Sequence, residues 1–198
     1  MQKPTGYDEA KASGSFEPVE LGGHYLVIKQ VSEKQNKNGK PMVVVLFDFA
    51  QNDKQAGYFM EQFKNDIRPD KKWSNQATQY INVLDSDGNT SKAFKTFTTC
   101  VEHSNSGFTT QWGDNFCQQF KDKKIGGVFG EQMDYYNGDE KKKRVLRWFV
   151  SYDKVSDAKI PKISETQAFK NYKKNASIAS TNGFMNIPDS IEDELPFN

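Results

Sequence analysis

The chain has few of the residues on which disulfide scaffolds and most enzyme centres depend. Its 198 residues include 2 cysteines and 2 histidines. The two thiols, Cys100 and Cys117, cannot form a disulfide framework, and both fall where small buried apolar groups fit. No apolar run approaches the length of a membrane-spanning helix, and no basic-then-apolar signal segment opens the chain. We therefore expect a cytoplasmic protein in a reducing environment, without a membrane partner.

Motifs for catalysis are also missing. Residues 124–130 (KIGGVFG) lack the lysine that completes a phosphate-binding loop. In residues 85–89 (DSDGN) the glycine comes too early for a calcium loop and the closing glutamate is absent, which indicates a turn. Cys100, His103 and Cys117 provide at most three zinc ligands, so buried cysteines are the expected state. We predict that the chain is not an enzyme and uses no cofactor or metal.

Aromatic residues, by contrast, are abundant. The chain has 15 Phe, 8 Tyr and 3 Trp, which is 13% aromatic residues in a sequence that is only 35% hydrophobic. Phe47, Phe49, Phe94 and Phe97 are the expected core members. The remaining aromatic residues exceed what a core of this polarity needs, which favours stacking on a flat ligand.

Positive and negative charges are unevenly distributed along the chain. All 27 Lys and Arg lie at or before Lys174, and 4 acids but no base follow it. The body therefore carries a net charge of +5 (27 bases against 22 acids), and the end carries −4. A basic body with an acidic end is typical of a polyanion binder whose tail competes for the same groove. A net charge of this size is also ordinary for a globular domain.

Alternation of apolar and polar residues predicts five strands. They cover residues 23–31, 41–49, 79–84, 124–136 and 143–152. Asn38-Gly39 and Asn137-Gly138 are strong turn signals, so the first two strands and the last two should form hairpins. In residues 124–136 the glycines suit a β-bulge.

Helices are predicted between and after the strands. Phe94, Phe97 and Val101 recur three and four residues apart, which predicts an amphipathic helix over 90–103 with Asn89 or Thr90 as its cap. Shorter helices are predicted at 114–121 and 166–173, and 57–63 is predicted as a short strand or sheet edge.

Hairpin, strand, helix, hairpin is the order of the OB-fold. We therefore predict a mainly β fold with a helical insertion, an OB-fold-like five-stranded Greek-key barrel followed by a flexible C-terminal tail. A generic α+β domain with an antiparallel sheet is the alternative. The predicted parts are an extended arm (1–14), the barrel (15–155), a mixed extension (156–174), and a linker with an acidic tail (175–198).

In an OB barrel, nucleic acid lies across the middle strands between the loops of the two hairpins. Both loops are rich in lysine here, which suits phosphates, although lysines at hairpin tips also keep sheet edges soluble. The predicted phosphate contacts are Lys37, Lys40, Lys71, Lys72, Lys142 and Arg144. The predicted base-stacking residues are Trp73, Tyr80, Tyr135 and Trp148.

The end of the chain resembles a known family. Residues 191–197 (IEDELPF) resemble the C-terminal tip of bacterial and bacteriophage single-stranded DNA-binding proteins, and residues 15–31 (SFEPVELGGHYLVIKQV) are similar to the opening of phage-encoded members. The family's tip places its Phe in an apolar pocket of replication and repair proteins, and its acids against a basic rim. Family members end on the Phe, whereas Asn198 follows it here. The resemblance assigns partner binding to four residues, Asp193, Glu194, Pro196 and Phe197.

These observations predict a single-stranded DNA-binding protein without sequence preference. The resemblance implies a role in phage DNA replication or recombination inside a bacterial host, and leaves homo-oligomerisation open. One alternative is a metal-dependent nuclease that uses carboxylates in turns. Its candidate residues are Asp66, Asp70, Asp85 and Asp87. The other is an interaction protein, such as a virion component, whose tail alone binds a partner.

Overall fold

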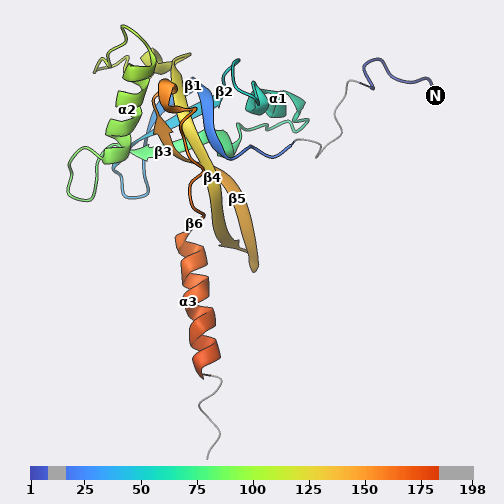
Figure 1. The fold of residues 1–198 in the computed structure, drawn as a ribbon, viewed down its shortest axis with the longest axis vertical. Helices are drawn as coiled ribbons and strands as arrows, with labels where there is room; N and C mark the ends of the chain where they lie inside the picture. The colour runs from blue at the N-terminus through green and yellow to red at the C-terminus, as the bar shows by residue number, and fades with distance from the viewer. Residues whose placement is uncertain (9–16, 183–198) are drawn as a thin grey trace, which may run out of the picture. The chain divides into compact units, whose positions relative to one another are not determined.

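The computed structural model describes residues 1–8 and 17–182, and a mainly antiparallel sheet is its largest feature (Figure 1). The six strands are β1 (Gly22–Gln35), β2 (Pro41–Phe49), β3 (Thr78–Asn82), β4 (Lys124–Tyr136), β5 (Asp139–Val150) and β6 (Ser164–Glu165). Their order is β3-β2-β1-β4-β5, and the short β6 pairs with β4 in parallel. The prediction of a mainly β fold is confirmed, and the bounds of β2 and β4 are those predicted.

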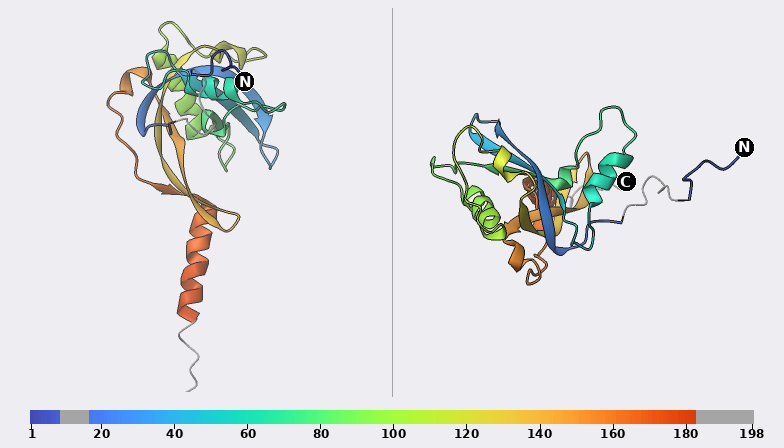
Figure 2. Two further views of the ribbon diagram at one scale, coloured as in Figure 1. Left: turned by 90° about the vertical axis from the view of Figure 1, so that its right-hand side faces the viewer. Right: turned by 90° about the horizontal axis from the view of Figure 1, so that it is seen from above.

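In the described residues, six helical segments accompany the sheet. The α-helices are α1 (Tyr58–Asn65), α2 (Lys92–Ser104) and α3 (Gln167–Asn182), and the 3-10 turns are η1 (Asn75–Ala77), η2 (Gln118–Phe120) and η3 (Tyr152–Lys154). Strands lie between α1 and α2 in Figure 1 and in the right view of Figure 2. Within the described part of the chain, no helix is both long enough and apolar enough to span a membrane.

By contacts, the chain divides into two compact units. The described residues of Met1–Glu131 and Arg144–Lys162 form the first unit, and those of Gln132–Lys143 and Ile163–Asn198 form the second. The division falls within β4 and β5, so the tip of that hairpin is grouped with β6 and α3. The sequence alone predicts a single range, 15–155, that includes this tip.

In β1 the alternation of buried and exposed residues shifts by one position after Ile28. Leu26 and Ile28 are buried, and the next buried apolar residue is Val31, three positions later. The register of β1 against β2 shifts between Ile28 and Gln30, so Lys29 is the extra residue of a β-bulge. The bulge keeps Val31 on the core side despite its odd spacing.

A glycine in β4, Gly127, lies where side chains of both neighbouring strands approach the backbone closely. A Cβ at Gly127 would lie 2.6 Å from side-chain atoms of both Leu26 in β1 and Leu146 in β5. The register of β4 against β1 is continuous from the pair Gly22–Phe129 to the pair Val27–Lys124. The pairing of residues 124–129 with β1 therefore contains no bulge, and Gly127 allows close packing there.

The core joins strands that are distant in the sheet order. The ring of Phe47 in β2 lies 6.2 Å from that of Phe149 in β5 and 6.2 Å from that of Phe129 in β4. In a flat sheet β2 and β5 would be about 14 Å apart. The sheet is therefore strongly curved, and the bend of β1 can be followed in Figure 2. The four phenylalanines predicted for the core are buried.

The segment predicted as a strand or sheet edge at 57–63 is helix α1. The buried carboxylate of Asp48 in β2 accepts the backbone N–H groups of Phe59 (3.0 Å) and Met60 (3.2 Å) at the start of this helix. These are donors that the helix itself cannot satisfy. A cap supplied by a distant strand therefore stabilises the helix, and the local sequence contains no sign of it.

The other predicted helices differ from the structure at their ends. Helix α2 is confirmed, but its cap is Ser91, whose Oγ accepts the N–H of Phe94 at 3.1 Å. The helix predicted at 114–121 is only the turn η2. Helix α3 continues to Asn182, beyond the predicted end at Lys173, so the first residues of the predicted linker are helical.

Candidate nucleic-acid interface

Three rows of side chains cross β1, β2 and β3 on the face opposite the core. Because alternate residues of a strand point to the same side, paired residues share a face. We call this set the outer strand face. Strand pairing defines the rows as Gln30–Leu46–Thr78, Ser32–Val44–Tyr80 and Lys34–Met42–Asn82.

The outer strand face combines apolar and polar groups. Tyr80 is 57% exposed in the middle row, beside Val44, which is buried. Met42 and Leu46 are half-buried. A solvated antiparallel face normally alternates polar residues with the core residues, whereas β2 is apolar on both faces. This arrangement can accept a flat ligand on Tyr80, as predicted for that residue.

The loop between β1 and β2 is held in one conformation. The side-chain oxygen of Asn36 accepts the N–H groups of Asn38 (2.9 Å) and Lys40 (3.1 Å), and its amide nitrogen donates to Asn82 on the outer strand face (3.0 Å). Lys40 is half-buried and donates to the carbonyl oxygens of Asp85 and Ser86. Of the two predicted phosphate contacts in this loop, Lys37 is exposed and Lys40 anchors the loop.

Trp73 lies at the edge of the core. Its Nε1 donates to the carbonyl oxygen of Ala77 at 3.2 Å, and its ring is 5.7 Å from that of Phe63. The ammonium of Lys71 lies over the ring of Phe63, with Nζ 5.7 Å from the ring centroid, and Lys72 is exposed. The indole of Trp73, which was predicted to stack on a base, is therefore engaged in packing against Phe63 and in a hydrogen bond to Ala77.

β5 presents Trp148 and uses Arg144 for internal contacts. Trp148 is 45% exposed, whereas Leu146 and Phe149 are buried, which identifies the solvent-facing position that the sequence pattern left open. The guanidinium of Arg144 donates to the carbonyl oxygen of Val19 at 2.6 Å. The backbone carbonyl oxygen of Arg144 accepts a hydrogen bond from the side chain of Gln76 at 2.9 Å, which joins the segment before β3 to β5.

In the second unit, the ring of Tyr135 stacks on that of Tyr172, with centroids 4.0 Å apart and planes 9° apart. One face of the predicted stacking residue is therefore occupied. The neighbouring Tyr136 is 59% exposed, with the ammonium of Lys141 5.4 Å from its ring centroid. Lys142 is exposed at the same hairpin tip.

The four predicted tail residues, Asp193, Glu194, Pro196 and Phe197, lie outside the described residues.

Two of the four acids considered for a nuclease, Asp66 and Asp85, have partners within the chain. Asp66 binds the guanidinium of Arg68, and the hydrogen bonds from this residue lower the pKa of Asp66 to about 2. Asp85 accepts the N–H groups of Asp87 (3.0 Å) and Asn89 (2.9 Å), which closes the predicted turn. Among the described residues, no three His, Cys, Asp or Glu are grouped to hold a metal ion.

The two cysteines do not form a joint site with His103. Burial raises the pKa of the Cys100 thiol to about 11. Burial also raises the pKa of Cys117, whose Sγ lies 3.8 Å from a carboxylate oxygen of Glu33. His103 is exposed at the end of α2.

No known protein family and no curated protein matches the chain.

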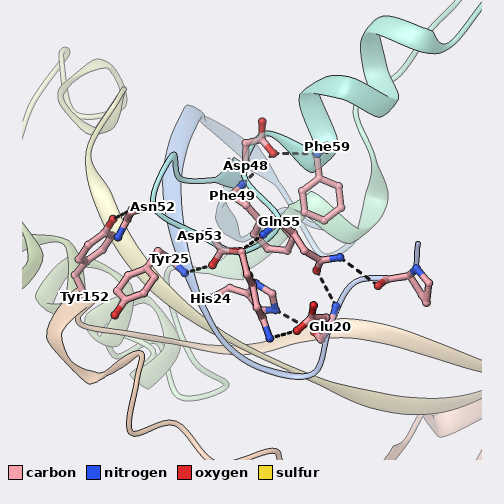
Figure 3. Close-up of polar contacts among 12 residues, drawn as sticks. Glu20, His24, Tyr25, Asp48, Phe49, Asn52, Asp53, Gln55, Phe59 and Tyr152 are labelled. Carbon is pink, nitrogen blue, oxygen red and sulfur yellow. Dashed lines mark hydrogen bonds and ion pairs between the residues drawn. The ribbon is translucent and has the colours of Figure 1, made fainter. Parts of the chain in front are cut away.

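The structure also contains a buried polar network that the sequence did not indicate (Figure 3). The carboxylate of Asp53 accepts from the ring of His24 (3.0 Å) and from the N–H groups of Tyr25 (2.8 Å) and Gln55 (2.9 Å). Burial raises the pKa of Asp53, but these hydrogen bonds outweigh it and the pKa is lowered. The other ring nitrogen of His24 faces the carbonyl oxygen of Glu20 at 3.0 Å, so both nitrogens meet acceptors.

This network is structural. His24 has no exposed surface, its ring stacks on that of Phe49 at 4.4 Å, and the edge of Phe129 closes another side. A substrate has no access to the imidazole. The His24–Asp53 pair therefore links β1, the loop after β2 and the segment that precedes β1.

Proposed function

We propose that the chain is a single-stranded DNA-binding protein with an OB-fold-like barrel, and that it binds without sequence preference. The outer strand face, with Tyr80 at its centre, carries this proposal. In OB-folds the corresponding strands bind oligonucleotides. Tyr80 offers a π surface that any base can stack on, and the polar residues of the same rows can bond to bases and sugars.

The strand order supports the barrel. The path β3-β2-β1-β4-β5, with α2 between β3 and β4, is the order expected of an OB-fold whose β3 and β5 come together. The curvature that brings the rings of Phe47 and Phe149 close together also supports closure of the sheet between β3 and β5. The hydrogen bond from Gln76, just before β3, to the Arg144 carbonyl oxygen in β5 supports it too.

The charges next to the outer strand face support a polyanionic ligand. Lys34 lies in its third row and Lys37 is exposed at the adjoining loop. Lysine ammonium groups neutralise phosphates and release counterions, so the affinity should fall as the salt concentration rises. With the acidic Pro-Phe end, the same proposal includes recruitment of replication or recombination proteins.

The test is fluorescence anisotropy of labelled oligo-dT and of a matching duplex at several salt concentrations. Tyr80→Ala should weaken binding to the single strand by about 5- to 150-fold, the effect of losing one base stack. Tyr80→Phe should retain most of the affinity, and Tyr7→Ala, at another exposed tyrosine, should not change it. Absence of binding by the wild-type chain at low salt would refute the proposal and favour an interaction protein without a nucleic-acid role.

A further inference from the structure

A cavity of about 510 Å³ opens at the end of the β1–β2 hairpin. Its apolar lining includes Val43, Val83, Phe94 and Phe116, and Lys34 also contributes to the lining. Val43 faces the core side of the hairpin, whereas Lys34 belongs to the outer strand face. The cavity therefore lies mainly on the core side of the hairpin and reaches Lys34 and Met42, the third-row residues of the outer strand face, at the hairpin's end.

Trp112 forms one side of this cavity and is largely unburied. Its indole is 72% exposed, although it stacks on Phe116 with centroids 5.3 Å apart and planes 13° apart. The ring of Phe94 lies 6.2 Å away. One face of the indole thus rests on the protein and the other is open to solvent. Such exposure of a large aromatic side chain beside a cavity is typical of a ligand site.

The loop that carries Trp112 is fixed by polar contacts. The side-chain amide of Gln119 accepts the N–H of Gln111 and donates to its carbonyl oxygen, both at 2.7 Å, and also donates to the carbonyl oxygen of Phe116 at 2.7 Å. Gly113, with φ +121°, provides a backbone conformation that L side chains rarely adopt. Because these contacts hold the loop, stacking of a ligand on Trp112 should require little additional ordering of the loop.

We infer that this cavity binds one unstacked base of the single strand that crosses the outer strand face, with Trp112 as its stacking platform. The inference rests on the proposed function and adds a second aromatic contact to it. A base fits against the rings of the lining, which is mostly apolar and has Glu33, Lys34 and Gln35 as its polar members. Its phosphate would lie near Lys34, a lining residue, and Lys37 is a further exposed positive charge in the loop between β1 and β2.

The first measurement uses Trp112 as the reporter. Trp73→Phe with Trp148→Phe leaves Trp112 as the only tryptophan of the chain. Addition of unlabelled oligo-dT should quench its emission in a saturable manner, with the dissociation constant that anisotropy gives for the same variant. If anisotropy shows binding while the Trp112 emission is unchanged, no base reaches the indole and the inference is overturned.

The second measurement is affinity for labelled oligo-dT by anisotropy. Trp112→Ala should weaken binding by about 5- to 150-fold and Trp112→Phe by less, whereas Ile160→Ala, an exposed apolar control, should have no effect. Gln119→Leu should weaken binding by a smaller factor and reduce the quenching of Trp112, since it acts only by positioning the indole.

The outcomes separate the two proposals. If the wild-type chain does not bind oligo-dT, the proposed function fails and this inference with it. If the wild type binds and Trp112→Ala binds equally well, only the cavity inference is overturned. A labelled peptide of residues 189–198 is the third ligand. If Trp112→Ala loses that peptide while its affinity for oligo-dT is retained, the cavity is a peptide site and the inference is also overturned.

Discussion

The outer strand face and the His24–Asp53 network both combine aromatic rings with polar groups, yet they differ in exposure. In the network, rings enclose the polar atoms and each polar atom has a partner. On the outer strand face, Tyr80 is exposed above an apolar strand. A buried and satisfied polar group stabilises a fold, whereas an exposed aromatic on an apolar surface is available to a ligand. Substitutions in the two regions should therefore change different measured quantities.

The largest expected effect is on the buried side. Asp53→Ala removes one partner of a buried pair and leaves Nδ1 of His24 and two N–H groups without their acceptor. The free energy of unfolding should fall by about 3–5 kcal/mol in urea denaturation. Asp157→Ala, at an exposed aspartate, is the matched control and should change it by less than about 0.5 kcal/mol. Equal effects of the two variants would contradict a stabilising role for the network.

Tyr80→Ala should show the opposite pattern. Its free energy of binding to oligo-dT should become less favourable by about 1–3 kcal/mol, because a base stack is lost. Its free energy of unfolding should stay within about 0.5 kcal/mol of the wild type, because the side chain is exposed. Anisotropy measures the affinity, and urea denaturation in the same buffer measures the free energy of unfolding. A loss of stability as large as the loss of affinity would place Tyr80 with the structural residues.

The stability that the His24–Asp53 network provides should depend on pH in the acid range. The pKa of Asp53 is lower in the folded chain than the ordinary value near 3.9, so its ionised form is stabilised by folding. That contribution is fully present above about pH 4 and is lost as the pH falls through the folded-state pKa. Asp53→Asn should therefore lose less stability than the wild type between about pH 5 and pH 2. Identical acid profiles for the two proteins would contradict the lowered pKa.

The smallest expected effect concerns one exposed lysine. Lys37→Ala should reduce the slope of the logarithm of affinity against the logarithm of salt concentration by about 0.7, the value for one phosphate contact on a single strand. Lys121→Ala, at an exposed lysine outside the predicted interface, is the control. An unchanged slope for Lys37→Ala would remove this residue from the interface.

Local patterns were most informative where one segment contains its own boundary signals. β2 begins at Pro41 after a turn, and its apolar run ends at Phe49, so its bounds agree with the prediction. Helix α2 followed from the spacing of Phe94, Phe97 and Val101, which are all buried. Each of these elements is specified within a short window of sequence, so pattern reasoning succeeds there.

Contacts between distant segments account for the misses. Helix α1 depends on Asp48, 10 residues before its first residue, Tyr58. In the sequence Trp73, which follows Lys71 and Lys72, is the stronger stacking candidate, but only the structure shows that Trp73 packs at the core and Trp148 faces solvent. For Trp112, the only local sign was a tryptophan before a glycine in a polar loop, since the Gln119 contacts that hold it are tertiary.

The sequence by itself determined the mainly β character, the two hairpins and the long amphipathic helix, because alternation, turn residues and helical spacing act locally. It also determined the acidic Pro-Phe end, which is a property of composition. Only the tertiary structure decided which aromatic residues are exposed, how β1, β2 and β3 combine their outer residues into one face, and where Trp112 meets the end of the β1–β2 hairpin. These depend on strand register, on the curvature of the sheet and on hydrogen bonds between segments, and none of these is encoded in a single stretch of chain.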